Sequence, residues 1–134
     1  MNKKILYGVF WGEKLSFLAH VKELIPKIKI SPEEDVAMLE IARSDTQSVH
    51  LVFMPVGRKV RAHYHKERDE FYVILQGRAK LRIKNDIYEV GEGYVAFIPR
   101  GTIHGVESTG ADPLVLIFVS SPPYDPRKDR RYVE

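Results

Sequence analysis

The sequence predicts an all-β domain, an antiparallel sandwich or barrel, with a short helical or extended segment at its N-terminal end. Three observations support this fold class. From residue 36 onward, short runs of β-forming residues alternate with turn residues. The run at residues 80–84 (KLRIK) alternates strictly, which indicates a strand with one solvated face. The run at residues 114–119 (LVLIFV) is apolar on both faces and should be a central strand.

The N-terminal quarter is expected to differ from the rest of the chain. The 134 residues, 44% hydrophobic and 29% charged, suit one folded domain. We expect residues 1–35 to form an appendage of that domain, residues 36–121 the β-barrel, and residues 122–134 a C-terminal tail. Apolar residues at helical spacing predict one short helix over residues 13–25, closed by Pro26. Ser31 and Pro32 suit the start of a second helical turn.

Nine strands are expected in the barrel region, each bounded by turn-forming residues. Gly57, Gly77, Gly93 and Gly101 stand at strand ends, where turns need positive φ. The expected strands cover residues 36–42, 49–54, 59–65, 70–75, 79–83, 87–90, 94–98, 105–107 and 114–119.

Charge and hydropathy exclude several partner classes. The net charge is +3, and basic residues are interleaved with acidic ones, so no nucleic-acid partner is expected. The basic run at residues 127–131 is interpreted as a solvated tail. Glu13 and Lys14 interrupt the first apolar patch, which favours a strand over a signal peptide, and no stretch has the length of a membrane span. We therefore expect a cytoplasmic protein without a membrane partner. Few amide side chains beside many Lys and Glu are typical of a heat-adapted source.

The stretch HYHKERDE (residues 63–70) suggests a metal site. His63 and His65 stand two apart in an expected strand, so their side chains project from the same face. The antiparallel return after the polar residues 66–69 would bring Glu70 beside them. His104 follows a Pro-Gly turn further along the chain. Because the sequence has no cysteine, any metal must be held by nitrogen and oxygen ligands.

Plainer interpretations of these residues also exist. Two histidines flanking a surface strand are common, and the pair alone is more often ordinary than metal-binding. A charged loop such as residues 66–69 is usually only a solvated turn. His20 and His50 lie away from the cluster in the sequence and are interpreted as ordinary residues.

The residues around the histidines resemble the cupin family of small jelly-roll β-barrels. Both cupin motifs are present between residues 57 and 108, and the one departure is Ser108, where the second motif has Asn. The matching residues are Gly57, His63, His65, Glu70 and Gly77 in the first motif, and Gly93, Pro99, Gly101 and His104 in the second.

This resemblance implies a jelly-roll fold and a set of metal ligands. The implied ligands are His63, His65, Glu70 and His104, around one divalent transition metal: Mn, Fe, Ni, Co, Zn or Cu. Since all four are present, we expect a metal-competent cupin. Four ligands on a six-coordinate ion leave two positions for water or substrate.

Two functions from different classes remain open. The first is a metal-dependent enzyme of the isomerase or dioxygenase type, acting on a small polar or carboxylated substrate chelated at the metal. Short cupins include both chemistries. The second is a non-catalytic module that binds a small, sugar-like ligand beside a bound metal. The fold does not choose between them.

Tyr72 and Arg61 are the candidate catalytic or substrate-binding residues. Strand alternation places Tyr72 and Ile74 on the metal side, and places Arg61 there if no bulge intervenes. Arg61 could bind a carboxylate or phosphate, and Tyr72 could donate a proton or a hydrogen bond. The plainer alternatives are a solvated rim residue for Arg61 and a packed wall residue for Tyr72. An apolar lining of Ile74, Phe97 and similar residues would favour a small, mostly non-sugar ligand.

A homodimer is expected, because small barrels with exposed strand edges commonly pair. Tyr7, Phe10, Trp11 and Phe17 are the candidate interface residues. The alternative is that these aromatic side chains only close one end of their own barrel.

Overall fold

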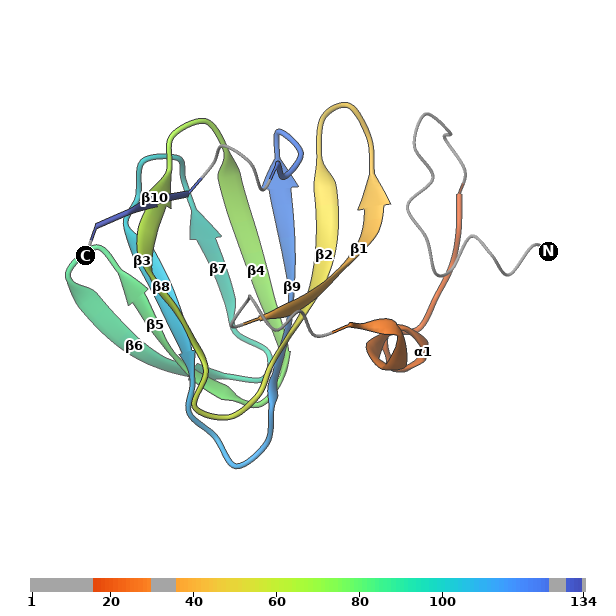
Figure 1. The fold of residues 1–134 in the computed structure, drawn as a ribbon, viewed down its shortest axis with the longest axis horizontal. Helices are drawn as coiled ribbons and strands as arrows, with labels where there is room; N and C mark the ends of the chain where they lie inside the picture. Colours follow the sequence, from red (N-terminus) through yellow and green to blue (C-terminus); the bar gives the residue numbers. More distant parts are fainter. Residues whose placement is uncertain (1–15, 30–35, 126–129, 134) are drawn as a thin grey trace.

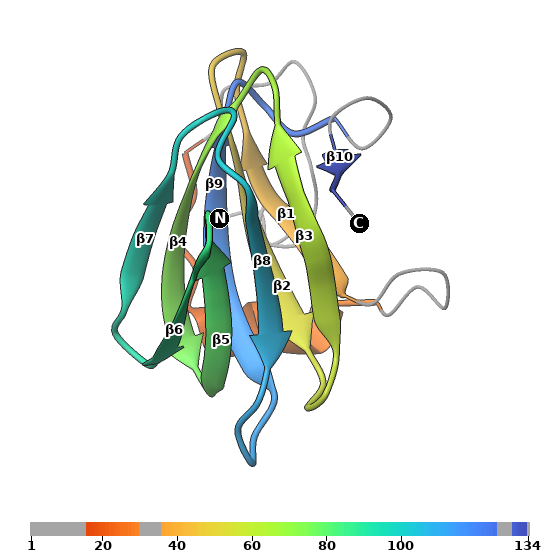
Figure 2. The same cartoon turned by 90° about the vertical axis from the view of Figure 1, so that its left-hand side faces the viewer.

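Two five-stranded antiparallel sheets face each other in the protein (Figures 1 and 2). The computed structural model describes residues 16–29, 36–125 and 130–133. Sheet A has the strand order β1-β2-β9-β4-β7, and sheet B has the order β10-β3-β8-β5-β6. The expected all-β jelly-roll fold is confirmed.

The strands of both sheets are short. Those of sheet A are β1 (Ala37–Arg43), β2 (Ser48–Met54), β4 (Asp69–Gln76), β7 (Val95–Ile98) and β9 (Leu114–Ser121). Those of sheet B are β3 (Lys59–His65), β5 (Arg78–Ile83), β6 (Asp86–Gly91), β8 (His104–Ser108) and β10 (Arg130–Tyr132).

All nine expected strands are present, each within a few residues of its expected bounds. β9 lies between β2 and β4 in sheet A, as expected of a strand that is apolar on both faces. In β5, Leu81 is buried and Lys80 is exposed, which confirms the alternation.

The C-terminal strand β10 was not expected from the sequence. Residues 130–132, interpreted above as part of a solvated tail, pair antiparallel with β3. This pairing covers the backbone of β3, which would otherwise be an edge strand of sheet B with unpaired N–H and C=O groups.

The helical segment is much shorter than the sequence predicts. Helix α1 covers Val21–Leu24 and continues into a 3-10 turn, η2 (Ile25–Lys27). His20 has an extended backbone and its Nδ1 accepts from the Lys22 N–H, so the helix begins there rather than at residue 13. Residues 13–15 and the expected turn at residues 31–34 lie outside the described residues.

Two apolar clusters hold these elements together. The larger lies between the sheets and includes Met54, Ile74, Leu81 and Leu114. The smaller lies on the outer face of sheet A, where α1 packs against the sheet (Figure 1). Leu24 of α1 is 3% exposed there and joins Leu51 and Val115. None of the helices in the described ranges has the length and hydrophobicity of a membrane-spanning segment.

Candidate metal centre

His63 and His65 lie on β3, and both side chains are buried. Because side chains alternate along a strand, the two imidazoles leave the same face of sheet B, as expected from their spacing. Their ring centroids are 4.7 Å apart. The two rings therefore face the space between the sheets as a pair.

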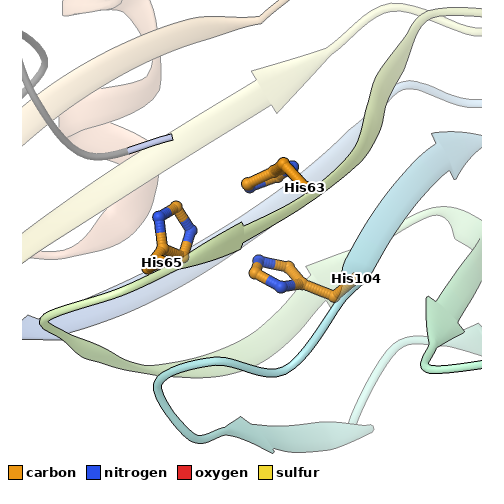
Figure 3. A group of neighbouring side chains, drawn as sticks. All are labelled: His63, His65 and His104. Atoms are coloured by element: carbon orange, nitrogen blue, oxygen red, sulfur yellow. The ribbon is translucent and has the colours of Figure 1, made fainter. Parts of the chain in front are cut away.

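His104 joins this pair from the neighbouring strand. It begins β8 and stands directly opposite His63 in the β3–β8 register. The preceding turn contains Gly101, whose φ is +82°, and the Gly101 N–H donates to the carbonyl of His65 at 2.7 Å. This hydrogen bond ties the turn to β3. Figure 3 shows the three rings turned toward one another, and one nitrogen of each lies within 4.8 Å of the others.

Backbone carbonyls fix the orientation of two of the rings. Nδ1 of His63 lies 2.7 Å from the carbonyl of Arg61, and Nδ1 of His104 lies 2.9 Å from the carbonyl of Thr102. A carbonyl can only accept, so each Nδ1 carries the proton that it donates. In a neutral His63 ring, Nε2 then presents its lone pair, which is the arrangement typical of a metal-binding histidine. Nε2 of His104 lies 3.2 Å from Oε1 of Glu70.

Burial favours the neutral imidazoles that a metal requires. Burial, together with the neighbouring His104, lowers the pKa of His63 to about 3. Burial also lowers the pKa of His65, although hydrogen bonding to Glu70 opposes this. At neutral pH neither ring must lose a proton before it can bind a metal ion.

Glu70 lies beside the three histidines but has other partners as well. Its Oε1 is 3.3 Å from Nε2 of His65 and 3.2 Å from Nε2 of His104. Its Oε2 accepts from the guanidinium of Arg68. Burial alone would raise the pKa of this carboxyl, but hydrogen bonds from the two histidines and the charge of Arg68 hold the pKa well below its usual value. Glu70 is therefore an anion in the interior.

Residues 50–120 match the family model described as "Cupin domain". The chain belongs to the cupin family. This confirms the resemblance carried by the two motifs, and it places the matched region over most of the two sheets.

Curated relatives of this cupin share parts of their length with it. A protein of Methanocaldococcus jannaschii, named as uncharacterized, is 38% identical over 58% of this chain and 62% of its own length. An uncharacterized protein of Aquifex aeolicus is 30% identical over 78% and 84%. A mannose-1-phosphate guanylyltransferase of Salmonella typhimurium is 36% identical over 57% of this chain but only 16% of the enzyme.

Solved structures support the same fold. The crystal structure of a Thermus thermophilus protein has a TM-score of 0.70 at 26% identity, and the match covers 80% of this chain and 98% of that one. A predicted oxalate decarboxylase from Thermotoga maritima has a TM-score of 0.61 at 25% identity, over 65% of this chain and 80% of that one.

Arg68 is a site residue that the sequence interpretation missed. That interpretation places it in a solvated turn, but it is 2% exposed. Besides the ion pair with Glu70, its Nη2 lies 3.1 Å from Nδ1 of His65, and its guanidinium carbon lies 4.8 Å from the centroid of the Tyr124 ring. One signal was available, because residues 68, 70 and 72 have the same parity and would share one face of an extended chain.

Arg61, in contrast, does not lie where the alternation placed it. The β3–β8 register shifts between Val60 and His63, and this bulge breaks the period of two. The Arg61 side chain is exposed, lies with its guanidinium carbon 4.3 Å from the centroid of the Tyr132 ring, and lines a groove with Lys59. Arg61 was expected on the metal side only if no bulge intervened. Because this bulge does intervene, the expectation is wrong.

Tyr72 does face the histidines, and its hydroxyl donates to Oε1 of Glu70 at 2.9 Å. Burial and the negative charge of Glu70 raise the Tyr72 pKa well above its usual value, so the phenol stays protonated and acts as a hydrogen-bond donor. Ile74 is buried and lines a different cavity, which Tyr72 also lines. Phe97 is 59% exposed, so its expected place in the lining is wrong.

A cavity of about 50 Å³ opens beside the histidines. That volume holds about three to five water-sized groups. Its lining combines apolar and polar side chains. The polar ones are His63, His65, Arg68, Glu70, Tyr72 and Arg130.

The side chains present fit a divalent first-row ion. Three imidazole nitrogens converge in a buried place, two of them oriented by carbonyls, and nitrogen ligands suit such metals. Ligands bound at right angles to one ion lie about 3 Å apart, given bonds of about 2.1 Å. The distances from Glu70 to His65 and His104 have this size.

The two remaining histidines have structural roles. His50 is 1% exposed, stacks on Phe118 with ring centroids 4.4 Å apart, and its Nε2 lies 2.8 Å from the hydroxyl of Ser48. His20 is exposed and caps α1. Neither belongs to the group of three, in agreement with their interpretation as ordinary residues.

Proposed function

We propose that this cupin is a small metal-dependent enzyme, of the isomerase or dioxygenase type, that acts on a small polar or carboxylated substrate. The observation that carries the proposal is the buried group of His63, His65 and His104 beside a polar cavity. A structural metal site usually closes its coordination shell. Three or four protein ligands on a six-coordinate ion leave positions for a substrate.

Glu70 is the proposed fourth ligand. Its Oε1 lies within 3.3 Å of two of the histidines, and it is held there by Arg68 and Tyr72. When bound, a divalent metal polarises a substrate oxygen that coordinates it. The protein itself would orient the substrate: Tyr72 offers a protonated hydroxyl at the cavity, and Arg68 holds the carboxylate of Glu70 in place. The identity of the metal, among Mn, Fe, Ni, Co, Zn and Cu, is left to measurement.

A second candidate function is a non-catalytic cupin that binds a sugar-like ligand beside a metal. The similarity to part of a mannose-1-phosphate guanylyltransferase favours it, since that protein is named for a sugar phosphate. The similarity to a predicted oxalate decarboxylase favours the enzyme instead, since that name describes a reaction at a carboxylate.

Turnover measurements with reconstituted protein separate the two functions. The protein would be loaded with each candidate metal and assayed with sugar phosphates, diketones, catechols and small carboxylates, with and without O₂. Turnover that disappears in the double variant His63→Ala/His104→Ala supports the enzyme. Saturable binding of a sugar without any turnover across the panel supports the binding module and contradicts the enzyme.

We also propose a cytoplasmic homodimer. Of the candidate interface residues, Tyr7, Phe10 and Trp11 lie outside the described residues, and Phe17 is 37% exposed. Exposed apolar side chains on the edge strand β7, Val95 at 61% and Phe97 at 59%, add support, because a flat apolar edge is an aggregation hazard unless it is covered.

A further inference from the structure

Strand β10 brings Arg130 to the metal centre. In the β10–β3 register Arg130 stands opposite His65, and Arg131 stands opposite Tyr64. Residues directly opposite each other in an antiparallel pair project from the same face. Arg130 therefore shares the inner face with His65, and Arg131 points the other way. Consistent with this, Arg130 lines the cavity beside the histidines, whereas Arg131 is exposed.

The Arg130 guanidinium is only partly satisfied by the protein. Its Nη1 donates to the hydroxyl of Tyr132 at 3.2 Å, which is an exposed neighbour on the same strand. Its Nε is buried and has no hydrogen-bond partner within the described part of the chain. A buried N–H without an acceptor is unfavourable, and a ligand that brings an acceptor removes that cost.

The charges around the cavity also favour an anion. Glu70 is the carboxylate on the cavity wall, and Arg68 already pairs with it. No carboxylate of the described residues forms an ion pair with Arg130. A divalent metal at the histidines would add further positive charge in the same small space. Unpaired positive charge in a partly desolvated cavity attracts a negatively charged ligand.

We propose that Arg130 binds the carboxylate of a small ligand in this cavity, at the centre formed by His63, His65 and His104. The inference rests on the proposed function in placing the ligand at a metal centre, and it goes further by naming the charged group and its receptor. A guanidinium holds a carboxylate through paired N–H donors, and Nε is one of the donors in that fork. The cavity volume of about 50 Å³ restricts the ligand to a few non-hydrogen atoms beyond the metal-bound group.

The test measures the binding of malonate and of malonamate, in which one carboxylate is replaced by an uncharged amide of similar size. Protein loaded with cobalt reports binding through its visible absorption, and calorimetry gives the dissociation constant. Wild-type protein is expected to bind malonate more tightly than malonamate. Arg130→Gln should weaken malonate binding about 10- to 100-fold, as expected for loss of a charge-assisted hydrogen bond, and should abolish the preference over malonamate.

Arg131→Gln is the matched control, since it removes the same charge from the outer face of the same strand. It should leave the malonate dissociation constant within about twofold of wild type. Arg130→Lys, which keeps the charge but not the fork, should give an intermediate affinity. Unchanged thermal unfolding of Arg130→Gln would show that β10 still pairs with β3.

Three outcomes decide the inference. Equal weakening by Arg130→Gln and Arg131→Gln would overturn it, because the effect would then be a general one of net charge. A wild-type protein that holds metal but binds neither probe at millimolar concentration would also overturn it, while the proposed metal centre would stand. Conversely, protein that takes up no metal but loses malonate affinity in Arg130→Gln would support the anion site and contradict the proposed function.

Discussion

Removal of one partner of the buried ion pair between Arg68 and Glu70 should be one of the most destabilising single substitutions in the metal-free protein. Arg68 is 2% exposed and Glu70 is 4% exposed. Replacement of Arg68 by Met keeps the apolar stem and removes the charge. The carboxylate of Glu70 then stays buried with, among the described residues, the Tyr72 hydroxyl and the two imidazoles as its partners.

The expected cost follows from this burial. Removing one partner of a buried pair leaves an uncompensated charge and costs about 3–5 kcal/mol. A neighbouring ion pair supplies a control, because Arg100 pairs with Asp69 at 3.3 Å but is 57% exposed. Solvent screens that pair, so Arg100→Met should cost at most about 1 kcal/mol. The double variant Arg68→Met/Glu70→Gln should recover much of the lost stability, since it also removes the unpaired, buried charge of Glu70.

Urea unfolding at pH 7 in the presence of a chelator is the appropriate assay, because a bound metal would add its own stabilisation. With a slope of about 2 kcal/mol per M, Arg68→Met should lower the midpoint by about 2 M and Arg100→Met by less than about 0.5 M. Equal midpoints for the two single variants would refute the account of Arg68. A double variant as unstable as Arg68→Met would show that the loss comes from packing on Tyr124 instead of charge.

Two further predictions concern acidity and assembly. Metal-free protein should be independent of pH above about 6.5 and lose stability below it, since His50 and His63 have pKa values of about 3 when folded and 6.5 in the unfolded chain. Below pH 6.5 the unfolded chain binds protons that the folded chain does not. The free energy of unfolding should therefore fall by about 1.4 kcal/mol per pH unit for each of the two histidines. A urea midpoint that is equal at pH 6.5 and 4.5 would contradict this. For assembly, sedimentation equilibrium at micromolar concentration should give twice the chain mass, and Phe97→Lys should shift the protein toward the monomer; a wild-type monomer would refute the dimer.

The parts of the site that the sequence predicted follow from local rules. His63 and His65 share a face because a strand has a period of two, and this relation holds within any uninterrupted stretch. Gly57, Gly77 and Gly101 have φ values between +82° and +87°, as the turn interpretation requires. Local rules cannot predict that His104 lies beside His63 and His65, because about forty residues separate it from them in the sequence. The resemblance to the family supplied that prediction.

The parts that were missed depend on partners distant in the sequence. The bulge that turns Arg61 outward is set by pairing with β8, where a side chain at Gly105 would lie 3.0 Å from the carbonyl of Val60. Arg68 is buried because of the Glu70 carboxylate and the Tyr124 ring. The parity that Arg68 shares with Glu70 is a local signal, but the contact with Tyr124 joins residues far apart in the sequence. Strand β10 is short, covering only Arg130–Tyr132, and basic in composition, so its pairing depends on the free edge of β3.

The central claim, that His63, His65 and His104 form a metal centre, is tested most directly by the metal content of the purified protein. Elemental analysis after dialysis against a mixture of first-row divalent ions should give close to one metal per chain for wild type and for His20→Ala, in which a histidine outside the site is removed. The double variant His63→Ala/His104→Ala should bind less than about a tenth as much, because removing two of the three nitrogen ligands leaves too few donors to hold the ion. Metal content equal to that of wild type in a folded double variant, or no metal in wild type, would contradict the assignment.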